Sequence, residues 1–326
     1  MTLLIFKVNQ LGDNVVFLPV VQSLLAAHPG WRLVLLTSPT AARLYEVCAP
    51  QVELRVFETA KFNGAWRRPW QLLSLAAQIR ALRPDACLLG DDQGSVAHLL
   101  ARLSGAKTCV GPATQHVRLN RLLHTRVDPV LTEPVATHNW RIAKAGFALP
   151  DSMPPPDLTA FGTDRSQAIV IHAGGSREYQ RWPLPNYIGL ANRLAQTHPV
   201  RWIVQGHEAG LDDTVQQVQT SSLDDLVRVI AGARLYIGNN SGPMHLATAC
   251  GTPGVILIGP SSPRWDPVWH GEKFDLLREP RLSCQPCDTP ARPVNHCTNT
   301  EAPMACLNRW TVDAVHARVL KACGQN

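Results

Sequence analysis

The sequence of 326 residues has no uninterrupted apolar run long enough to span a bilayer, and its mean hydropathy is −0.06. It therefore lacks the pattern of an integral membrane protein. Charged residues make up only 17%, and their balance is +6, far from the charge density of a dedicated nucleic-acid binder. We expect no nucleic-acid partner, because a mild positive excess suits an anionic ligand or a membrane surface instead.

The opening segment, 1–13, also lacks the long apolar core and the small-residue cleavage site of a signal peptide. It predicts a first strand instead. Nine cysteines are an odd number, and five of them are scattered at Cys48, Cys87, Cys109, Cys250 and Cys323. Without a secretory signal, we expect a cytoplasmic protein whose thiols are reduced.

Short apolar runs alternate with segments of helical periodicity along most of the chain. The runs predict strands at 3–8, 32–37, 52–57, 86–89, 108–110, 167–172, 200–205, 235–238 and 255–258. An apolar stretch over 15–27 predicts a helix with Pro19 near its first turn. Nearly continuous apolar strands that alternate with helices predict parallel sheets covered by helices on both faces.

The chain is longer than one hydrophobic core usually serves, so we expect two domains. A proline-rich segment without a periodic pattern, 149–165, is the best candidate for the linker. It divides the chain into domains 1–150 and 151–326, both of the α/β class. Ligands of such sheets bind beyond the carboxyl ends of the strands, so we expect functional residues there.

Asp13 follows the first predicted strand, in the segment Gln10-Leu11-Gly12-Asp13. Its side chain could cap the helix that follows. It could instead lie at a ligand site, where a helix N-terminus keeps the carboxylate ionised and ready to accept a proton from a hydroxyl. The sequence alone leaves both interpretations open.

Two loops of small and polar residues follow strands of the second half. In the first, Gly174 and Gly175 would let backbone N–H groups approach an anion, and Ser176 would add a donor. In the second, Asn240 and Ser241 precede a helix whose free N–H groups would face the ligand. A further segment of this kind, 259–263, follows the next strand, and although each alone is ordinary turn chemistry, it and the second loop together on neighbouring strands predict a diphosphate site.

Four cysteines crowd together late in the chain in the pattern C-x2-C-x9-C-x8-C, at Cys284, Cys287, Cys297 and Cys306. In a reduced compartment the tight C-x2-C pair favours a metal site over a disulfide. We expect a structural zinc or iron site, remote from the chemistry. The alternative is a loop of free thiols.

Taken together, these motifs resemble those of glycosyltransferase family nine, the ADP-heptose:lipopolysaccharide heptosyltransferases. The resembling segments cover nearly the whole chain: LGD before a proline-containing helix, HAGGS with RWP, GNNSGPMHLATACGTP, and IGPSSP. The resemblance implies a GT-B fold of the α/β class, in which two Rossmann-like doubly wound domains face a central cleft. It also implies an inverting transfer without a catalytic metal or another cofactor.

The resemblance gives roles to individual residues. The family's catalytic base corresponds to Asp13. The residues implied in donor binding are Gly174, Gly175, Ser176, Arg177, Gln180, Arg181, Glu208, Asn240, Ser241, Gly242 and His245. Two of them depart from the family, because Gln180 stands where lysine is frequent and Asn240 where aspartate is frequent. Arg177 or Arg181 could replace the missing positive charge.

The acceptor side is implied less directly, because it rests on two short polar segments of the first half. Asp92 and Gln93 follow a strand, where the family binds sugar acceptors, although a polar loop would have the same composition. Arg118 and Arg121 begin a basic stretch that could meet phosphates of a lipid-linked glycan or form a solvated helix face. With Gly12, these four residues are our candidates for acceptor binding.

The segment 66–70, WRRPW, combines interfacial aromatic residues with cations. This composition suits a membrane surface, although a loop that enters a helix can have it too. We expect a cytoplasmic protein with peripheral contact at the inner membrane.

The most specific hypothesis is an inverting glycosyltransferase. It would move a heptose or related sugar from a nucleotide diphosphate sugar, ADP-heptose, to a lipopolysaccharide-type or protein acceptor. The alternative is a catalytically silent subunit that only binds sugar nucleotides, which the departures at Gln180 and Asn240 motivate. Asp13 discriminates between them, because a silent relative has no chemical reason to retain that carboxylate.

Overall fold

The computed structural model describes residues 1–91, 94–114, 117–164, 166–204, 206–279, 282–289 and 294–324. The chain forms two compact units, Met1–Pro156 and Asp157–Asn326. The division therefore falls inside the proline-rich segment that the sequence marked as a linker. No helix among the described residues is long and apolar enough to cross a membrane.

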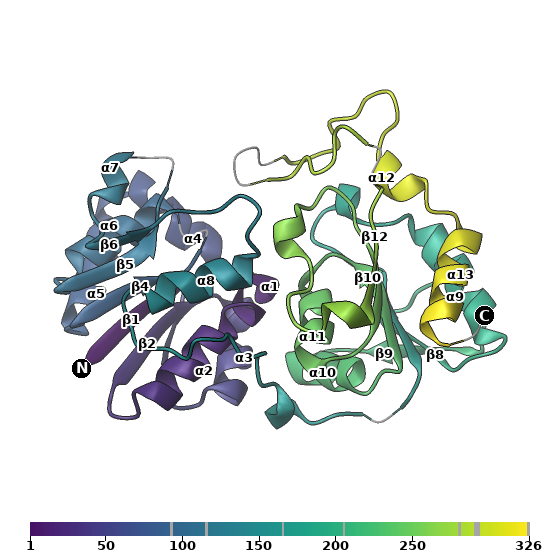
Figure 1. Ribbon diagram of the computed structural model, residues 1–326, viewed down its shortest axis with the longest axis horizontal. Coiled ribbons are helices and arrows are strands. Elements are labelled where there is room, and N and C mark those ends of the chain that lie inside the picture. The colour runs from purple at the N-terminus through teal and green to yellow at the C-terminus, as the bar shows by residue number, and fades with distance from the viewer. Residues whose placement is uncertain are drawn as a thin grey trace. The chain divides into compact units, whose positions relative to one another are not determined.

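Six parallel strands form the sheet of the first unit, in the order β3-β2-β1-β4-β5-β6 (Figure 1). Their bounds are β1 (Thr2–Lys7), β2 (Arg32–Thr37), β3 (Glu53–Val56), β4 (Ala86–Leu89), β5 (Thr108–Pro112) and β6 (Thr125–Val127). The direction of the strand order reverses between β1 and β4. The carboxyl ends of these two strands therefore form the topological switch point, where doubly wound sheets bind ligands.

The helices of the first unit are α1 (Leu11–Val15), α2 (Leu18–Ala27), α3 (Pro39–Cys48), α4 (Thr59–Gly64), α5 (Pro69–Ala81), α6 (Ser95–Leu103), α7 (Val117–Asn120) and α8 (Val135–Lys144), with the 3₁₀ turn η1 (Ala65–Arg67). The helix expected over 15–27 is divided, because α1 ends at Val15 and α2 begins at Leu18. Pro19 lies in the first turn of α2, as expected, where its missing N–H costs little.

The core of the first unit lies on the sheet face covered by α4, α5 and α6. Leu4 and Phe6 of β1 pack there with Phe62 of α4, Ile79 of α5 and Leu100 of α6. Helices α2 and α8 contact each other and lie on the other face (Figure 1). Both faces are thus covered, which explains why the central strands are apolar on both sides.

The second unit repeats this plan with the strand order β12-β11-β10-β7-β8-β9 (Figure 1). Its strands are β7 (Ile169–His172), β8 (Val200–Val204), β9 (Val215–Gln219), β10 (Leu235–Asn239), β11 (Gly254–Leu257) and β12 (Phe274–Leu277), all in parallel pairs. The switch point lies between β7 and β10. The sequence did not predict β6, β9 and β12, which are edge strands and only partly buried.

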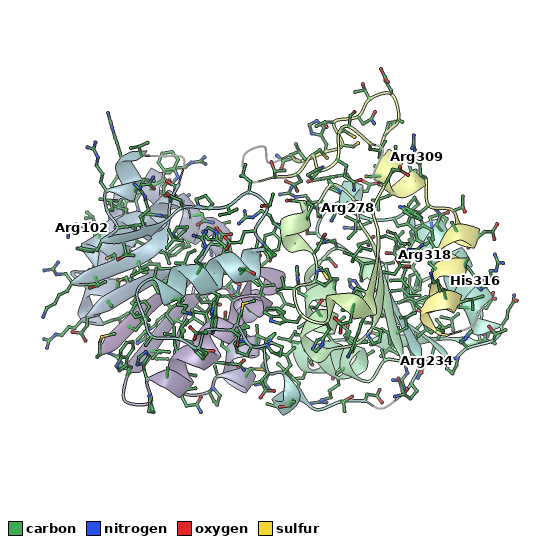
Figure 2. All side chains as sticks on the ribbon, viewed as in Figure 1. Arg102, Arg234, Arg278, Arg309, His316 and Arg318 are labelled. Carbon is green, nitrogen blue, oxygen red and sulfur yellow. The ribbon has the colours of Figure 1, made fainter. Side chains whose placement is uncertain are left out.

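The helices of the second unit are α9 (Leu184–Ala195), α10 (Leu223–Ala231), α11 (Gly242–Cys250), α12 (Ala305–Asn308) and α13 (Val312–Ala322). Helices α9 and α13 cover the face where Trp182, Tyr187 and Trp202 are buried. The carboxylate of Asp275 on β12 pairs with Arg318 of α13 at 2.5 Å, and Arg234 donates a hydrogen bond to the carbonyl of Cys323 (Figure 2). These contacts fasten the last helix to the sheet.

Candidate functional site

Asp13 lies in the first turn of α1, directly beyond the carboxyl end of β1 at the switch point of the first sheet. The N-cap position of α1 is Gln10, and its backbone N–H donates to the carboxylate of Asp13 at the third helical position, so Asp13 contributes to capping the helix. Its loop is fastened by Asn14, whose amide donates to the carbonyls of Asn9 and Gln10 at 3.1 and 2.8 Å. The Tyr45 hydroxyl donates to the Asn14 Oδ1 at 2.9 Å, which fixes that amide in turn.

Lys7, the last residue of β1, is fully buried, and its charge acts on the carboxyl of Asp13. Its Nζ donates a hydrogen bond of 3.0 Å to the carbonyl of Asp91 and lies 5.7 Å from the centre of the Phe17 ring. A buried ammonium needs compensation, because losing its hydration is costly. The carboxylates of Asp13 and Asp91, both beyond the ends of β1 and β4, supply the opposite charge.

Two opposing effects set the pKa of the Asp13 carboxyl. Burial raises this pKa above its ordinary value, and the charge of Lys7 is the largest effect that lowers it. Hydrogen bonds from the backbone N–H groups of Asp13 and Gln10 also lower the pKa, while the charge of Asp91 raises it. The balance leaves a carboxylate that accepts a proton more readily than an exposed one.

The side chain of Asp91 is positioned by α8. Its carboxylate lies 3.3 Å from Nδ1 of the buried His138, and its backbone N–H donates to the Asn139 Oδ1 at 2.7 Å. Gly90 leaves the space for this arrangement, because a Cβ there would lie 2.8 Å from Cδ of Lys7. Sequence reasoning missed Lys7 and His138. Nothing in a strand-terminal lysine or a helical histidine signals that folding will bury both beside carboxylates.

The acceptor candidates are only partly covered by the described residues. Gly12 is buried in α1, next to Asp13. Arg118 and Arg121 are exposed around α7, beyond the carboxyl end of β5. Asp92 and Gln93 lie outside the described residues. The candidate site in the first unit therefore consists of a buried charge cluster, with exposed arginines two strands away in the sheet.

In the second unit, the segment Gly174–Gln180 follows β7 and folds back on itself. A Cβ on Gly174 would lie 2.8 Å from Cε1 of His172, so the backbone reaches its path only because this residue is glycine. The Ser176 hydroxyl donates to the Gln180 Oε1 at 3.1 Å, and the Gln180 Nε2 donates to Asp288 at 3.3 Å. Gln180 is thus occupied by Ser176 of its own loop and by Asp288 of the segment after β12.

The two arginines of this loop differ in what they contact. The Arg177 guanidinium donates hydrogen bonds of 2.6 Å to the Tyr179 hydroxyl and to the Val294 carbonyl, and lies 3.6 Å from Asp288. The exposed Arg181 uses its Nε to bond the carbonyl of Gly175 at 2.8 Å. Its terminal nitrogens have no partner among the described residues, so Arg181 is the better placed of the two to meet an anion.

Asn239, at the end of β10, joins this loop to the neighbouring strand. The side chain is fully buried, and its Nδ2 donates to the carbonyls of Ala173 and Gly174 at 3.2 and 3.0 Å. Its Oδ1 accepts from the Trp182 N–H at 2.9 Å and from the Tyr187 hydroxyl at 3.0 Å. The sequence did not indicate a role for Asn239, because the family motif aligns with the next residue, Asn240.

Asn240, Ser241 and Gly242 form the entry into α11, and the structure places them beside the loop after β11. The Asn240 Nδ2 donates to the carbonyl of Trp265 at 3.4 Å. Ser241 is the N-cap residue, and its hydroxyl bonds the Asn239 carbonyl at 3.3 Å rather than an N–H of the helix. The second residue of α11 is a proline without an N–H, and the N–H of the third donates to the Ser241 carbonyl at 3.0 Å. The N–H of Gly242 is therefore the one at the start of α11 that is available to an anionic ligand.

Two histidines near these loops are neutral. Burial lowers the pKa of His245 to about 4, and its ring stands edge-on to Trp265 with the centres 5.8 Å apart. Burial, with the charge of Arg181, lowers the pKa of His172 to about 4. At neutral pH both rings offer hydrogen bonds without adding charge.

Glu208 lies beyond the carboxyl end of β8. Its backbone N–H and carbonyl exchange hydrogen bonds of 2.9 and 3.0 Å with the Gln217 side chain of β9. Its carboxylate is half-buried. The structure thus brings most of the donor candidates to one edge of the second sheet, with Glu208 towards the β9 side.

The four cysteines of 284–306 are partly buried and lie near one another. Burial raises the pKa of the Cys306 thiol to about 12, and the charges of Cys287, Cys297 and Cys284 add to this rise. The Cys297 Sγ accepts a hydrogen bond of 3.2 Å from the Met304 N–H. No three His, Cys, Asp or Glu side chains among the described residues are grouped so that they could hold a metal ion.

Comparison with known proteins identifies relatives of this chain. It is 25% identical to lipopolysaccharide heptosyltransferase 1 of Pseudomonas aeruginosa over 324 residues, which covers 88% of this chain and 86% of that protein. The structure of Escherichia coli heptosyltransferase WaaC with ADP-2-deoxy-2-fluoro heptose superposes with a TM-score of 0.74 at 18% identity, covering 98% and 99% of the two chains. The GT-B fold expected from the sequence is confirmed.

A more distant structure is the iron-containing dodecameric glycosyltransferase TibC from enterotoxigenic E. coli. It superposes with a TM-score of 0.64 at 15% identity, over 99% of this chain and 76% of that one. Residues 74–296 match the sequence profile of Glycosyltransferase family 9 (heptosyltransferase). Since that match spans more than half of the chain, including the donor loops, this protein belongs to glycosyltransferase family 9.

Proposed function

We propose that this glycosyltransferase moves a heptose, or a related sugar, from ADP-heptose to a lipopolysaccharide-type acceptor with inversion at the anomeric carbon. The observation that carries the proposal is the Asp13 carboxylate beside the buried Lys7 cation, at the switch point of the first sheet. The Pseudomonas aeruginosa relative is a lipopolysaccharide heptosyltransferase, and the WaaC structure holds a fluorinated ADP-heptose, which supports this donor and acceptor.

In the proposed reaction Asp13 is the general base. The acceptor hydroxyl attacks the anomeric carbon, and its proton passes to the Asp13 carboxylate. A new carbon–oxygen bond forms while the bond from that carbon to the donor's phosphate oxygen breaks. The acceptor oxygen approaches the face opposite the nucleotide diphosphate, which leaves with the electron pair of the broken bond, so the anomeric configuration is inverted.

Lys7 keeps the base ionised in this scheme. Burial alone would raise the pKa of Asp13 further and leave more of it protonated, and a protonated carboxyl cannot accept the acceptor's proton. The cation of Lys7 opposes that effect without reaching solvent. Lys7 is therefore a positioning residue that acts through Asp13 and has no proposed contact with substrate.

The second unit would hold the leaving diphosphate. Backbone N–H groups after Gly174 and the N–H of Gly242 at the start of α11, together with Arg181, can stabilise the developing negative charge. Gln180 supplies no charge and is occupied by Ser176 and Asp288, so we assign the role of the family's lysine to Arg181. We propose that these groups make a catalytic metal unnecessary.

We also propose that Cys284, Cys287, Cys297 and Cys306 bind a structural zinc or iron ion. Four thiols are a ligand set that both metals accept, and the charges of the other three raise the pKa of Cys306. The described geometry does not group three of them closely enough for an ion, so binding would require the segment to draw its thiols together. The bound ion would organise a segment of low secondary-structure content.

Incubation with ADP-heptose and a heptose-free lipopolysaccharide acceptor tests the proposal, with the product identified by mass spectrometry and its anomeric configuration by NMR. We expect one added heptose of inverted configuration and equal turnover with and without chelator. Retained configuration, or strict dependence on a divalent ion, would contradict the mechanism. Transfer to a polypeptide but not to lipopolysaccharide would show that the acceptor is a protein instead.

A further inference from the structure

The first unit carries a concentration of exposed apolar side chains around η1 and α5. Trp66, Trp70 and Leu73 are 60%, 70% and 66% exposed, and Val56 at the end of β3 is 48% exposed. Soluble proteins rarely gather large apolar side chains in this way without a partner. We call the surface formed by Val56, Trp66, Trp70 and Leu73 the tryptophan patch.

The spacing on α5 shows that the tryptophan patch is separate from the core. The inward side of the helix consists of the buried Ile79 and the half-buried Leu72 and Leu75, which pack on the core of the first unit. Trp70 and Leu73 are three residues apart and point to the opposite side. A helix that only covers a core would be polar there, so α5 has a second apolar face that its own unit leaves uncovered.

A groove of about 420 Å³ adjoins the tryptophan patch. It is lined by residues from the end of β3, from α4 and from α5, among them Val56, Phe57, Lys61 and Trp70. The groove widens the apolar surface from a single helix face to a concave surface between two helices. An acyl chain or the glycerol region of a lipid fits such a surface better than a flat polar partner does.

The charges around the tryptophan patch favour an anionic partner. Between Glu58 and Arg80 the sequence has four cations, Lys61, Arg67, Arg68 and Arg80, and Glu58 is its one carboxylate. The Arg67 guanidinium lies over the Trp66 ring at 5.2 Å from its centre. Lys61, Arg67 and Arg68 are exposed and have no ion-pair partner among the described residues.

We infer that the tryptophan patch is the surface by which this protein binds an anionic lipid bilayer. Tryptophan side chains prefer the boundary between headgroups and acyl chains, and arginine and lysine beside them meet lipid phosphates. The inference rests on the proposed membrane-linked acceptor and assigns its membrane contact to Val56, Trp66, Trp70 and Leu73. Reversible contact would bring the enzyme to an acceptor that is confined to the membrane.

Co-sedimentation of the full chain with lipid vesicles tests the inference. The unmodified protein should bind vesicles that contain phosphatidylglycerol and bind pure phosphatidylcholine vesicles at least tenfold more weakly. A variant with Trp66→Ser, Trp70→Ser and Leu73→Ser should lose at least tenfold in affinity for the anionic vesicles. Its melting temperature should stay unchanged, because all three side chains are mostly exposed.

Two further variants serve as controls. Leu131→Ser removes an exposed leucine of the same unit, 76% exposed and distant in sequence, and should bind vesicles as the unmodified protein does. Arg67→Glu with Arg68→Glu should abolish the preference for phosphatidylglycerol. Transfer to a water-soluble acceptor without acyl chains should be the same in the triple-serine variant and the unmodified protein.

The outcomes distinguish between the proposed membrane contact and its assignment to the tryptophan patch. If the unmodified protein ignores anionic vesicles, the proposed membrane contact itself is overturned. If it binds them and the triple-serine variant binds equally well, only the assignment to the tryptophan patch is overturned. A protein that does not bind vesicles but dimerises until the three serines are introduced would show that the patch contacts a second copy of the chain instead.

Discussion

The carboxyl edges of the two sheets have the same topology but opposite chemistry. The edge of the first sheet concentrates buried charge, with Lys7 and Asp91 behind Asp13. The edge of the second sheet consists mainly of glycines, backbone N–H groups and the neutral amide of Asn239, with the exposed cation of Arg181 beside them. In the proposed mechanism, one plan of six parallel strands therefore supports two tasks, because the first edge tunes the pKa of a proton acceptor and the second leaves room for an anion.

Replacing the base should break this comparison most strongly. Asp13→Asn keeps the size of the side chain but removes the proton acceptor, so we expect kcat to fall about a hundredfold or more. Donor affinity, measured by calorimetry with ADP, should be unchanged because the donor loops belong to the second unit. A fully active variant with an intact melting temperature would end the assignment of Asp13 as base.

Removing the buried cation should show how strongly it affects the proton acceptor at the carboxyl edge of the first sheet. Lys7→Met fills the same space without charge, so it removes the largest effect that lowers the pKa of Asp13, and this pKa rises. Since the base works only when ionised, the acid limb of the pH–rate profile should move to higher pH. We expect about a tenfold loss of kcat at pH 7 that is largely recovered in alkaline buffer.

The pH profile distinguishes this role from a structural one. A loss of kcat that is equal at every pH, or a loss that follows the melting temperature, would show that Lys7 only supports the fold. Arg32→Met offers a matched control, because this cation on β2 of the same sheet is exposed and pairs with Glu53. It should leave the pH profile unmoved.

A smaller effect is expected at the second edge. Gly174→Ala places a Cβ 2.8 Å from the His172 ring, so the loop must shift away from the path that lets its N–H groups meet an anion. We expect the Kd for ADP to rise several-fold while the pH–rate profile keeps its shape. Gly206→Ala, in a loop of the same unit with no atom near the added Cβ, should change neither quantity.

Substitutions in the cysteine segment should affect the residues at the carboxyl edges of the two sheets least. Cys284→Ser should lower the melting temperature by a few degrees and leave the Kd for ADP unchanged, because the proposed metal is structural. Elemental analysis should find about one zinc or iron per chain in the unmodified protein and less in the variant. Metal-free protein with four alkylatable thiols would return the segment to a loop of free cysteines.

Much of the architecture could be predicted from local patterns. The central strands are short apolar runs, so their alternation with helices indicated two parallel sheets, and Pro19 marked the beginning of α2. The edge strands β9 and β12 escaped because only one side of each is covered, which gives mixed sequences such as VQQVQ. Edge pairing depends on the neighbouring strand, and a local pattern does not record it.

The candidate site was predictable where a motif lies within one loop. Asp13, Gly174 and Ser241 stand directly after strands, where ligands of such sheets bind. Lys7 and Asn239 were missed because their importance comes from contacts across the sheet, with Asp91 for the lysine and with Trp182 for the asparagine. Those contacts exist only once distant segments are folded together.

The four hydrogen bonds of Asn239 also restrict which chemistry this position tolerates over time. Its amide gives two hydrogens to carbonyl oxygens and receives two from an N–H and an O–H, so neither of its ends can be exchanged. Deamidation would turn the donating end into an oxygen that faces two other oxygens across about 3 Å. Spontaneous ageing of this one buried side chain would thus loosen the donor loop, whereas the neighbouring Asn240, half-buried with a single long contact, could age without that consequence.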